Sequence, residues 1–135
     1  MAKKRMFSLD VVSTDQFLDM PLRAQALYFH LGMHGDDDGF VANPQMIMRS
    51  TGCRMSDMKT LVSSGYVIPF STGIVAIRDW LLNNDLKNDR YHETRYQQEK
   101  ALLTLDGSKR YILARDLEPD CIRDEPGSET EQNRT

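Results

Sequence analysis

Cysteines and long apolar runs are both scarce in this chain, and their scarcity limits what it can be. The 135 residues include two cysteines, Cys53 and Cys121, which lie far apart without a neighbouring ligand pattern. Neither a disulfide framework nor a zinc site is expected from them. The longest apolar runs, 66–70 and 74–77, are too short to cross a bilayer, and the basic start of the chain lacks the apolar stretch of a signal peptide. We therefore expect a reduced, cytoplasmic protein.

Motifs that carry catalysis are also missing. The sequence holds no GxxxxGK[ST] phosphate loop, no nucleophile elbow and no plausible serine or cysteine triad, so it predicts neither enzyme activity nor a cofactor. His30 and His34 have a spacing that can hold a metal, but His30 falls on an apolar stripe and the HExxH glutamate is absent. The three aspartates at 36–38 lack the ligand spacing of a calcium loop. No metal site is expected.

Charge is distributed unevenly along the chain. The formal net charge is −3, which by itself argues against a nucleic-acid partner. Residues 116–135, however, carry seven acidic residues against two arginines, so the remainder of the chain has a small positive balance. A mildly basic body with an acidic tail is compatible with DNA binding without requiring it.

Caps and turns predict the first half of a mixed α+β fold. Residues 7–12 fit a brief strand or an extended lead-in, and Ser13 to Gln16 fit a capping box. Pro21 is well placed as the first residue of a longer helix. The helical spacing predicts a buried stripe made of Leu22, Ala26, Phe29, His30 and Met33. The aspartates and Gly39 then predict a turn, followed by a minimal strand over 40–42.

Two short helices and a hairpin are predicted next. Asn43 and Pro44 predict the start of a helix over Pro44–Thr51, with Ile47 and neighbouring methionines inward, and Gly52 its end. Ser56 is expected to cap the following helix, which buries Met58, Leu61, Val62 and Gly65 and exposes Asp57, Lys59, Thr60, Ser63 and Ser64. Runs 66–70 and 74–80, joined by 71–73, predict a β-hairpin in which Pro69 confines its strand to an edge. This order is that of a winged helix-turn-helix.

The remainder of the chain has a different character. Residues 83–95 are polar and poorly periodic, and 94–105 and 108–117 have helical composition. We therefore expect a flexible basic arm at 1–6, a winged-helix domain at 7–82, a linker and helical extension at 83–117, and a disordered acidic tail at 118–135.

The second helix of the predicted motif is the natural recognition helix, because that helix enters the major groove in helix-turn-helix proteins. Its hydroxyls allow close approach, and nearby cations can hold phosphates. The candidate DNA-binding residues of this region are Arg49, Arg54, Ser56, Lys59, Thr60, Ser63 and Ser64. An ordinary solvated helix face is the competing interpretation, and the shortage of arginine argues against strong direct readout.

Further candidates lie outside this helix. The hairpin tip carries no cation, so Arg78 on the second strand is the better candidate for phosphate contact. The arm supplies Lys3, Lys4 and Arg5, which equally fit a solubilising start. A stretch that mixes cations with aromatic residues suits phosphate contact and base stacking. The alternative, which we prefer, is an extension anchored on the domain by its tyrosines. That stretch contains Lys87, Arg90, Tyr91, His92, Arg95 and Tyr96.

Several motifs in order resemble one known family. RMFSLD at 5–10, DQFLDMP at 15–21, QALYFHLGM at 25–33 and DDDGFV at 36–41 look like the N-terminal domain of phage replisome organisers. The resemblance continues through GYVIPF at 65–70 and IRDW at 77–80. These proteins are related to DnaD-like replication initiation proteins. The resemblance implies a winged helix that binds double-stranded origin DNA and forms homo-oligomers. Longer members carry a C-terminal domain that engages the helicase or its loader. This chain departs from them there, because only a short acidic segment follows about residue 105.

Three hypotheses remain open on these grounds. The leading one is a non-catalytic, replication-associated DNA-binding module of phage or prophage origin, in which self-association presents several domains to DNA. The second is a winged-helix transcriptional regulator of a mobile element. The third is a protein-interaction adapter, which the weakly charged recognition helix keeps in view. Steep salt dependence is expected of phosphate contact and distinguishes the adapter from the other two.

Overall fold

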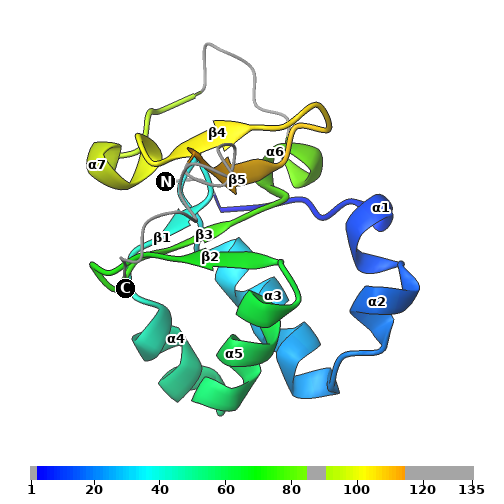
Figure 1. Cartoon of the computed structure of the whole chain (residues 1–135). Coiled ribbons are helices and arrows are strands. Elements are labelled where there is room, and N and C mark those ends of the chain that lie inside the picture. The colour runs from blue at the N-terminus through cyan, green and yellow to red at the C-terminus, as the bar shows by residue number, and fades with distance from the viewer. Residues whose placement is uncertain (1–2, 85–90, 115–135) are drawn as a thin grey trace, which may run out of the picture.

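A computed structural model describes residues 3–84 and 91–114 as one mixed helix and sheet fold (Figure 1). Its elements are α1 (Leu9–Val12), α2 (Asp15–Leu18), α3 (Leu22–Met33), β1 (Phe40–Val41), α4 (Pro44–Thr51), α5 (Met55–Ser63), β2 (Val67–Pro69), β3 (Val75–Ile77), α6 (Trp80–Asn83), α7 (Gln97–Lys100), β4 (Leu103–Leu105) and β5 (Tyr111–Leu113). The α+β prediction is confirmed at this level. No helix within these ranges is long and apolar enough to span a membrane.

A three-stranded antiparallel sheet lies at the centre of the molecule. Its order is β1-β3-β2, so β3 is the middle strand, with Ala76 paired to both Phe40 and Ile68. The predicted hairpin and the minimal strand are therefore confirmed, with shorter strands than the apolar runs. Pro69 lies on the edge strand β2, as its missing N–H requires. Helices α3, α4 and α5 cover one side of the sheet, and β4, β5 and α7 lie on the other (Figure 1).

Helix α3 buries a different stripe from the predicted one. Its buried residues are Ala24, Leu27, Tyr28, Leu31 and Gly32. Of the predicted stripe only Phe29 is half-buried, whereas Leu22, Ala26, His30 and Met33 are exposed. Helix α3 is apolar on more than one face, so two sets of residues satisfy the helical spacing, and contacts with α4 and α5 decide which set is buried.

The N-terminal segment is also helical where an extended lead-in was expected. The hydroxyl of Ser8 accepts a hydrogen bond from the Asp10 N–H and begins α1. The capping residue of α2 is Thr14, which accepts from the Phe17 N–H at 3.1 Å, and Ser13 instead ends α1. The capping prediction was therefore one residue early, because Ser and Thr are both favoured N-caps and here they are adjacent.

The extension contradicts the prediction of two helices. Residues 94–105 hold only the four-residue helix α7 before β4, and β5 lies where the second helix was expected to begin. Strands β4 and β5 form an antiparallel hairpin that pairs Leu103 with Leu113. The hairpin packs on the domain through Tyr111, whose N–H donates to the Arg78 carbonyl at 3.0 Å. The expected linker-like and tail residues at 85–90 and 115–135 lie outside the described residues.

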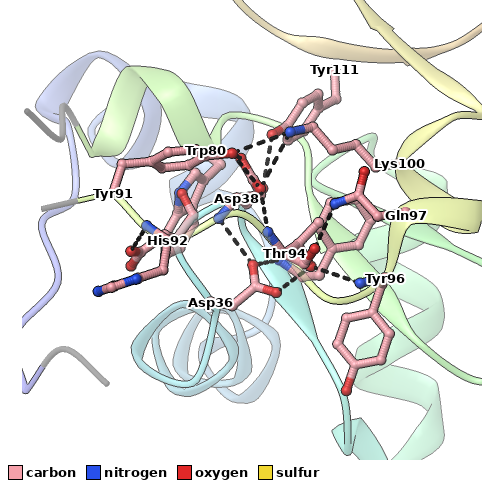
Figure 2. A network of polar contacts seen from close by, with 12 residues as sticks. Asp36, Asp38, Trp80, Tyr91, His92, Thr94, Tyr96, Gln97, Lys100 and Tyr111 are labelled. Atoms are coloured by element: carbon pink, nitrogen blue, oxygen red, sulfur yellow. Dashed lines mark hydrogen bonds and ion pairs between the residues drawn. The ribbon is translucent and has the colours of Figure 1, made fainter. Parts of the chain in front are cut away.

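The acidic turn, residues 36–38, holds this extension in place (Figure 2). Asp38 is buried and accepts hydrogen bonds from the Tyr91 hydroxyl at 2.7 Å, the Thr94 N–H at 2.8 Å and the Lys100 ammonium at 3.3 Å. Asp36 accepts from the Thr94 hydroxyl. The three aspartates therefore form a structural junction, in keeping with the expectation of a turn.

The N-terminal segment is likewise tied into the fold, so the prediction of a flexible arm is wrong at Arg5. The Arg5 guanidinium is buried, pairs with Asp37 at 3.0 Å, donates to the Gly35 carbonyl at 2.8 Å and lies over the Trp80 ring. Asn83 accepts the Ser8 N–H at 2.8 Å. Asn83 is buried in the packed domain, and so is the neighbouring Asn84, so the domain extends beyond residue 82.

Alkaline pH is expected to destabilise this fold. Burial raises the pKa of the Tyr28 and Tyr111 phenols. Burial alone would lower the pKa of Lys100, but the Tyr91 hydroxyl and the Asp38 charge outweigh it and the pKa is raised. These three groups bind their protons more tightly in the folded state than in the unfolded state. The stabilisation of the fold that results is complete below about pH 10 and is lost as pH rises through the folded-state pKa values.

Urea unfolding at several pH values measures this effect. We expect the free energy of unfolding to fall above about pH 10 by roughly 1.4 kcal/mol per pH unit for each proton concerned. Tyr111→Phe is expected to make that fall shallower, because it removes one such phenol. Equal free energies at about pH 8 and about pH 11 would contradict the prediction.

Candidate nucleic-acid interface

Helices α4 and α5 and the turn between them form the region in which recognition residues were predicted. Pro44 is the first residue of α4, and Gly52 ends it in the left-handed conformation with φ of 77°, both as predicted. Ile47 and Met48 are buried, whereas Met46 is exposed, so only part of the expected inward methionine set is confirmed. Both helices contact α3, which fixes them relative to the sheet.

Helix α5 begins at Met55, and Ser56 is therefore not its cap. The N-cap is Arg54, whose backbone N–H donates to the Asp57 carboxylate at 2.8 Å. The same carboxylate pairs with the Arg23 guanidinium of α3 at 3.1 Å. Asp57 is thus buried, contrary to the prediction that it belongs to the exposed face, because its carboxylate binds the Arg54 N–H and the Arg23 guanidinium.

The exposed charge of this region is entirely positive. Arg49, Arg54 and Lys59 are all exposed. Asp57 is the single acidic residue between positions 44 and 65, and Arg23 balances its charge. No acidic side chain of these two helices therefore opposes an approaching phosphate. We name the set Met46, Arg49, Arg54, Met55 and Lys59 the basic surface.

Four residues with short hydroxyl side chains lie on α5 and at its C-terminal end, where they could contact DNA at close approach. Ser56 and Ser63 are exposed, and Thr60 and Ser64 are half-buried. The Thr60 hydroxyl donates to the Ser56 carbonyl at 3.0 Å, and that of Ser63 to the Thr60 carbonyl at 3.2 Å. The hydroxyl donors of Thr60 and Ser63 are therefore used within the helix, and their oxygen lone pairs remain to accept from a base or a water.

Two of the predicted phosphate contacts are occupied inside the protein. Arg5 is buried against Trp80, as described above. Arg78 is half-buried and donates from Nη1 to the Tyr111 carbonyl at 2.9 Å, which ties β3 to the β4–β5 hairpin. The sequence could not reveal either role, because both partners lie about thirty residues away along the chain.

The tip of the β2–β3 hairpin is held by an acidic residue. The Thr72 hydroxyl donates to the buried Glu99 carboxylate of α7 at 2.7 Å. The tip therefore offers a phosphate no cation and has a carboxylate as its neighbour. That the tip itself contributes little to phosphate contact stays a prediction, and the neighbouring carboxylate supports it.

Some of the remaining candidate residues are exposed, and others pack on the domain. Lys3, Lys4 and Arg95 are exposed, and Arg95 stacks on the Tyr96 ring with 5.8 Å between the guanidinium carbon and the ring centroid. Tyr91 packs on the acidic turn through its hydroxyl, as the packing interpretation of this stretch predicted. Lys87 and Arg90 lie outside the described residues.

Comparison of the chain with protein-family models, curated protein sequences and solved structures finds no match in any of the three. Within residues 3–84 and 91–114, no group of three or more His, Cys, Asp or Glu side chains is placed to hold a metal ion.

Proposed function

We propose that this chain is a non-catalytic winged-helix protein that binds double-stranded DNA through α4 and α5 in replication initiation. The observation that carries the proposal is the uniformly positive exposed charge of Arg49, Arg54 and Lys59 beside a helix, turn, helix and hairpin order. In such motifs the second helix enters the major groove. Cations at its start and on the preceding helix then hold the flanking phosphates.

The division of roles follows from the side chains on the two helices. Lys59 and the hydroxyls of Thr60 and Ser63 lie on α5, which is the groove-facing helix in this proposal. Arg49 lies in the last turn of α4 and Arg54 precedes α5, where both can meet the phosphate backbone. Weak charge and small hydroxyls favour modest sequence discrimination, since bidentate arginine contacts to guanine carry most direct readout. The replication context rests on the resemblance to phage replisome organisers.

Charge removal on the basic surface tests the proposal. We expect the triple variant R49Q, R54Q and K59Q to lower duplex affinity at least tenfold, because three phosphate contacts are lost. The slope of log affinity against log salt should fall by about 3, roughly 1 per lost cation. Fluorescence-anisotropy titration at several salt concentrations measures both quantities, using duplex from the replication region of the element that encodes the chain.

A matched control separates local contacts from net charge. Gln98, Ala101 and Ser108 are exposed on or beside α7 and in the β4–β5 hairpin, and changing all three to glutamate lowers the net charge by the same amount. This control should bind DNA nearly as the wild type does. Equal weakening of both triple variants, or no binding by the wild type at low salt, would refute DNA binding through α4 and α5. A footprint at a promoter and not at an origin would favour the transcriptional regulator.

A further inference from the structure

The three exposed cations of α4 and α5 are not neutralised by the part of the fold that the structure describes. Arg49, Arg54 and Lys59 take part in none of the ion pairs found among residues 3–84 and 91–114. Those ion pairs use four other cations, namely Arg5, Arg23, Lys100 and Arg110. The positive charge of α4 and α5 is therefore available to an anionic group.

Negative charge is concentrated in one stretch of the same chain. Residues 116–135, which we name the acidic segment, carry seven acidic residues against two arginines, a net charge of −5. Its acids are Asp116, Glu118, Asp120, Asp124, Glu125, Glu129 and Glu131. Opposite charges attract each other over about 8 Å at physiological ionic strength. The acidic segment therefore has the chemistry that the three cations attract.

The acidic segment is long enough to reach both helices. Strand β5 ends at Leu113, and the 22 residues that follow it can span up to roughly 70 Å when extended. A compact domain of about 100 residues has a radius of gyration of only about 13 Å. The contact also requires no single flat face, because successive carboxylates of one chain can pair with separate cations.

The spacing of the cations fits that of the acids. Arg54 precedes α5 and Lys59 lies within it, so the helical rise places them about 8 Å apart along the axis. Arg49 is five residues before Arg54, so their Cα atoms are at most about 19 Å apart. An extended chain separates Glu125 from Glu131 by about 20 Å. A few consecutive acids therefore cover the distances between the cations.

Other exposed cations of the described residues are fewer or lie near acids. Arg95 is two residues from the exposed Glu93, and Lys109 is three residues from Asp106. Lys3 and Lys4 have no acidic residue within five positions, but they are only two. The three cations of α4 and α5 are therefore the largest such group.

We propose that the acidic segment binds Arg49, Arg54 and Lys59 of its own molecule and competes with DNA for them. The inference rests on the proposed function, because it assigns a regulator to that DNA-binding site. Tethering gives the segment an effective concentration in the millimolar range, so a weak contact is sufficient. The contact lowers duplex affinity and makes its salt dependence shallower, since salt weakens the competing segment as well as the DNA complex.

A spin label on Cys121 tests the contact in the full chain without DNA. Cys121 lies inside the acidic segment, and C53S leaves it as the single cysteine. We expect the label to broaden the amide signals of residues 49–59 more than those of α1 and α2. The difference should disappear at about 1 M salt, where the screening length is about 3 Å. Signals of residues 49–59 that the label leaves sharp would overturn the proposal.

Matched variants locate the contact. R49Q/K59Q removes two of the proposed cations and should reduce the broadening of residues 49–59 at least twofold. K3Q/K4Q removes two exposed cations elsewhere and should leave that broadening unchanged. The reverse result would place the segment on the start of the chain and refute binding to α4 and α5.

A mixed sample distinguishes contact within one molecule from contact between two. Spin-labelled chain without isotope label is mixed with isotope-labelled chain that carries no spin label. We expect no broadening in this mixture, because the segment binds its own molecule. Broadening of residues 49–59 there would place the segment on a second copy and contradict the proposal.

Duplex titration measures the competition. E125Q/E129Q/E131Q should raise duplex affinity about threefold at low salt, because it weakens a competitor present at a millimolar effective concentration. Its plot of log affinity against log salt should be steeper than that of the wild type. Q98K/A101K/S108K changes the net charge equally at exposed positions and should bind nearly as the wild type does. An equal rise in both variants would reduce the effect to net charge and refute competition.

The two readouts separate this inference from the proposed function. If no variant binds duplex, but the broadening of residues 49–59 requires the three cations and low salt, the proposed function fails and the contact stands. If duplex binding depends on the three cations, but the label broadens nothing in α4 and α5, only the contact is refuted.

Discussion

Gly39→Ala is expected to lower the free energy of unfolding by about 3–4 kcal/mol, one of the largest effects of a single methyl group in this fold. Gly39 has a φ of 87°, a conformation that costs residues with a Cβ about 1–2 kcal/mol. A Cβ here would also lie 2.6 Å from Cγ and 2.7 Å from Cβ of the buried Trp80. Overpacking of this kind adds about 1–3 kcal/mol.

Gly73→Ala provides the matched control for that experiment. Gly73 has a φ of 90°, but nothing lies within 4 Å of the Cβ that an alanine would add. It should therefore lose only the backbone contribution, about 1–2 kcal/mol. Urea denaturation of both variants measures the difference, which isolates contact with Trp80. Equal losses in the two variants would mean that Trp80 moves aside without cost.

Asp38→Ala is expected to release residues 91–100 from the domain. The Asp38 carboxylate accepts from the Tyr91 hydroxyl, the buried Thr94 N–H and the Lys100 ammonium. Hydrogen bonds to a charged acceptor contribute about 1.5–3 kcal/mol. Contributions within one network do not add, so we expect a local loss of roughly 3 kcal/mol, the value of one strong bond. The amide of Thr94 should then exchange with solvent about a hundredfold faster, because 1.4 kcal/mol corresponds to a factor of ten.

Hydrogen exchange followed residue by residue distinguishes local release from general unfolding. The amides of α3 and β3 should keep their protection in Asp38→Ala, whereas that of Thr94 should lose it. Tyr91→Phe removes one of the three contacts and should show a smaller change in the same direction. Unchanged exchange at Thr94 in Asp38→Ala would show that Asp36, which also binds Thr94, is sufficient to hold the segment.

Local signals in the sequence were enough to predict the centre of the fold. Pro44 and Gly52 bound α4 at the predicted residues, because a proline at the first helical position and a glycine after the last act through the backbone alone. Pro69 on the edge strand follows from its missing N–H. The exposure of Arg49, Arg54 and Lys59 was also predicted, because charged side chains are rarely buried unless they are paired.

Features that depend on distant partners were not predicted. Arg5, Asp57 and Arg78 were assigned to solvent, and each is held by a residue about thirty positions or more away. The β4–β5 hairpin was predicted as helix from its composition alone. In a segment this short, strand pairing and packing on the domain outweigh such a local preference. The stripe of α3 was misplaced because periodicity cannot choose between two apolar faces.

The tie between the start of the domain and residues 83–84 has a consequence for biosynthesis. The Met6 N–H donates to the Asn84 side chain, and the Ser8 N–H to that of Asn83, which also bonds the Tyr28 hydroxyl. These contacts join residues more than fifty positions apart, and such closures slow folding. While the chain is still growing, the segment 6–8 therefore lacks the two side chains that hold its backbone. Until translation passes residue 84, only ring contacts with Tyr28 and Phe29 keep Phe7 in place on the nascent chain.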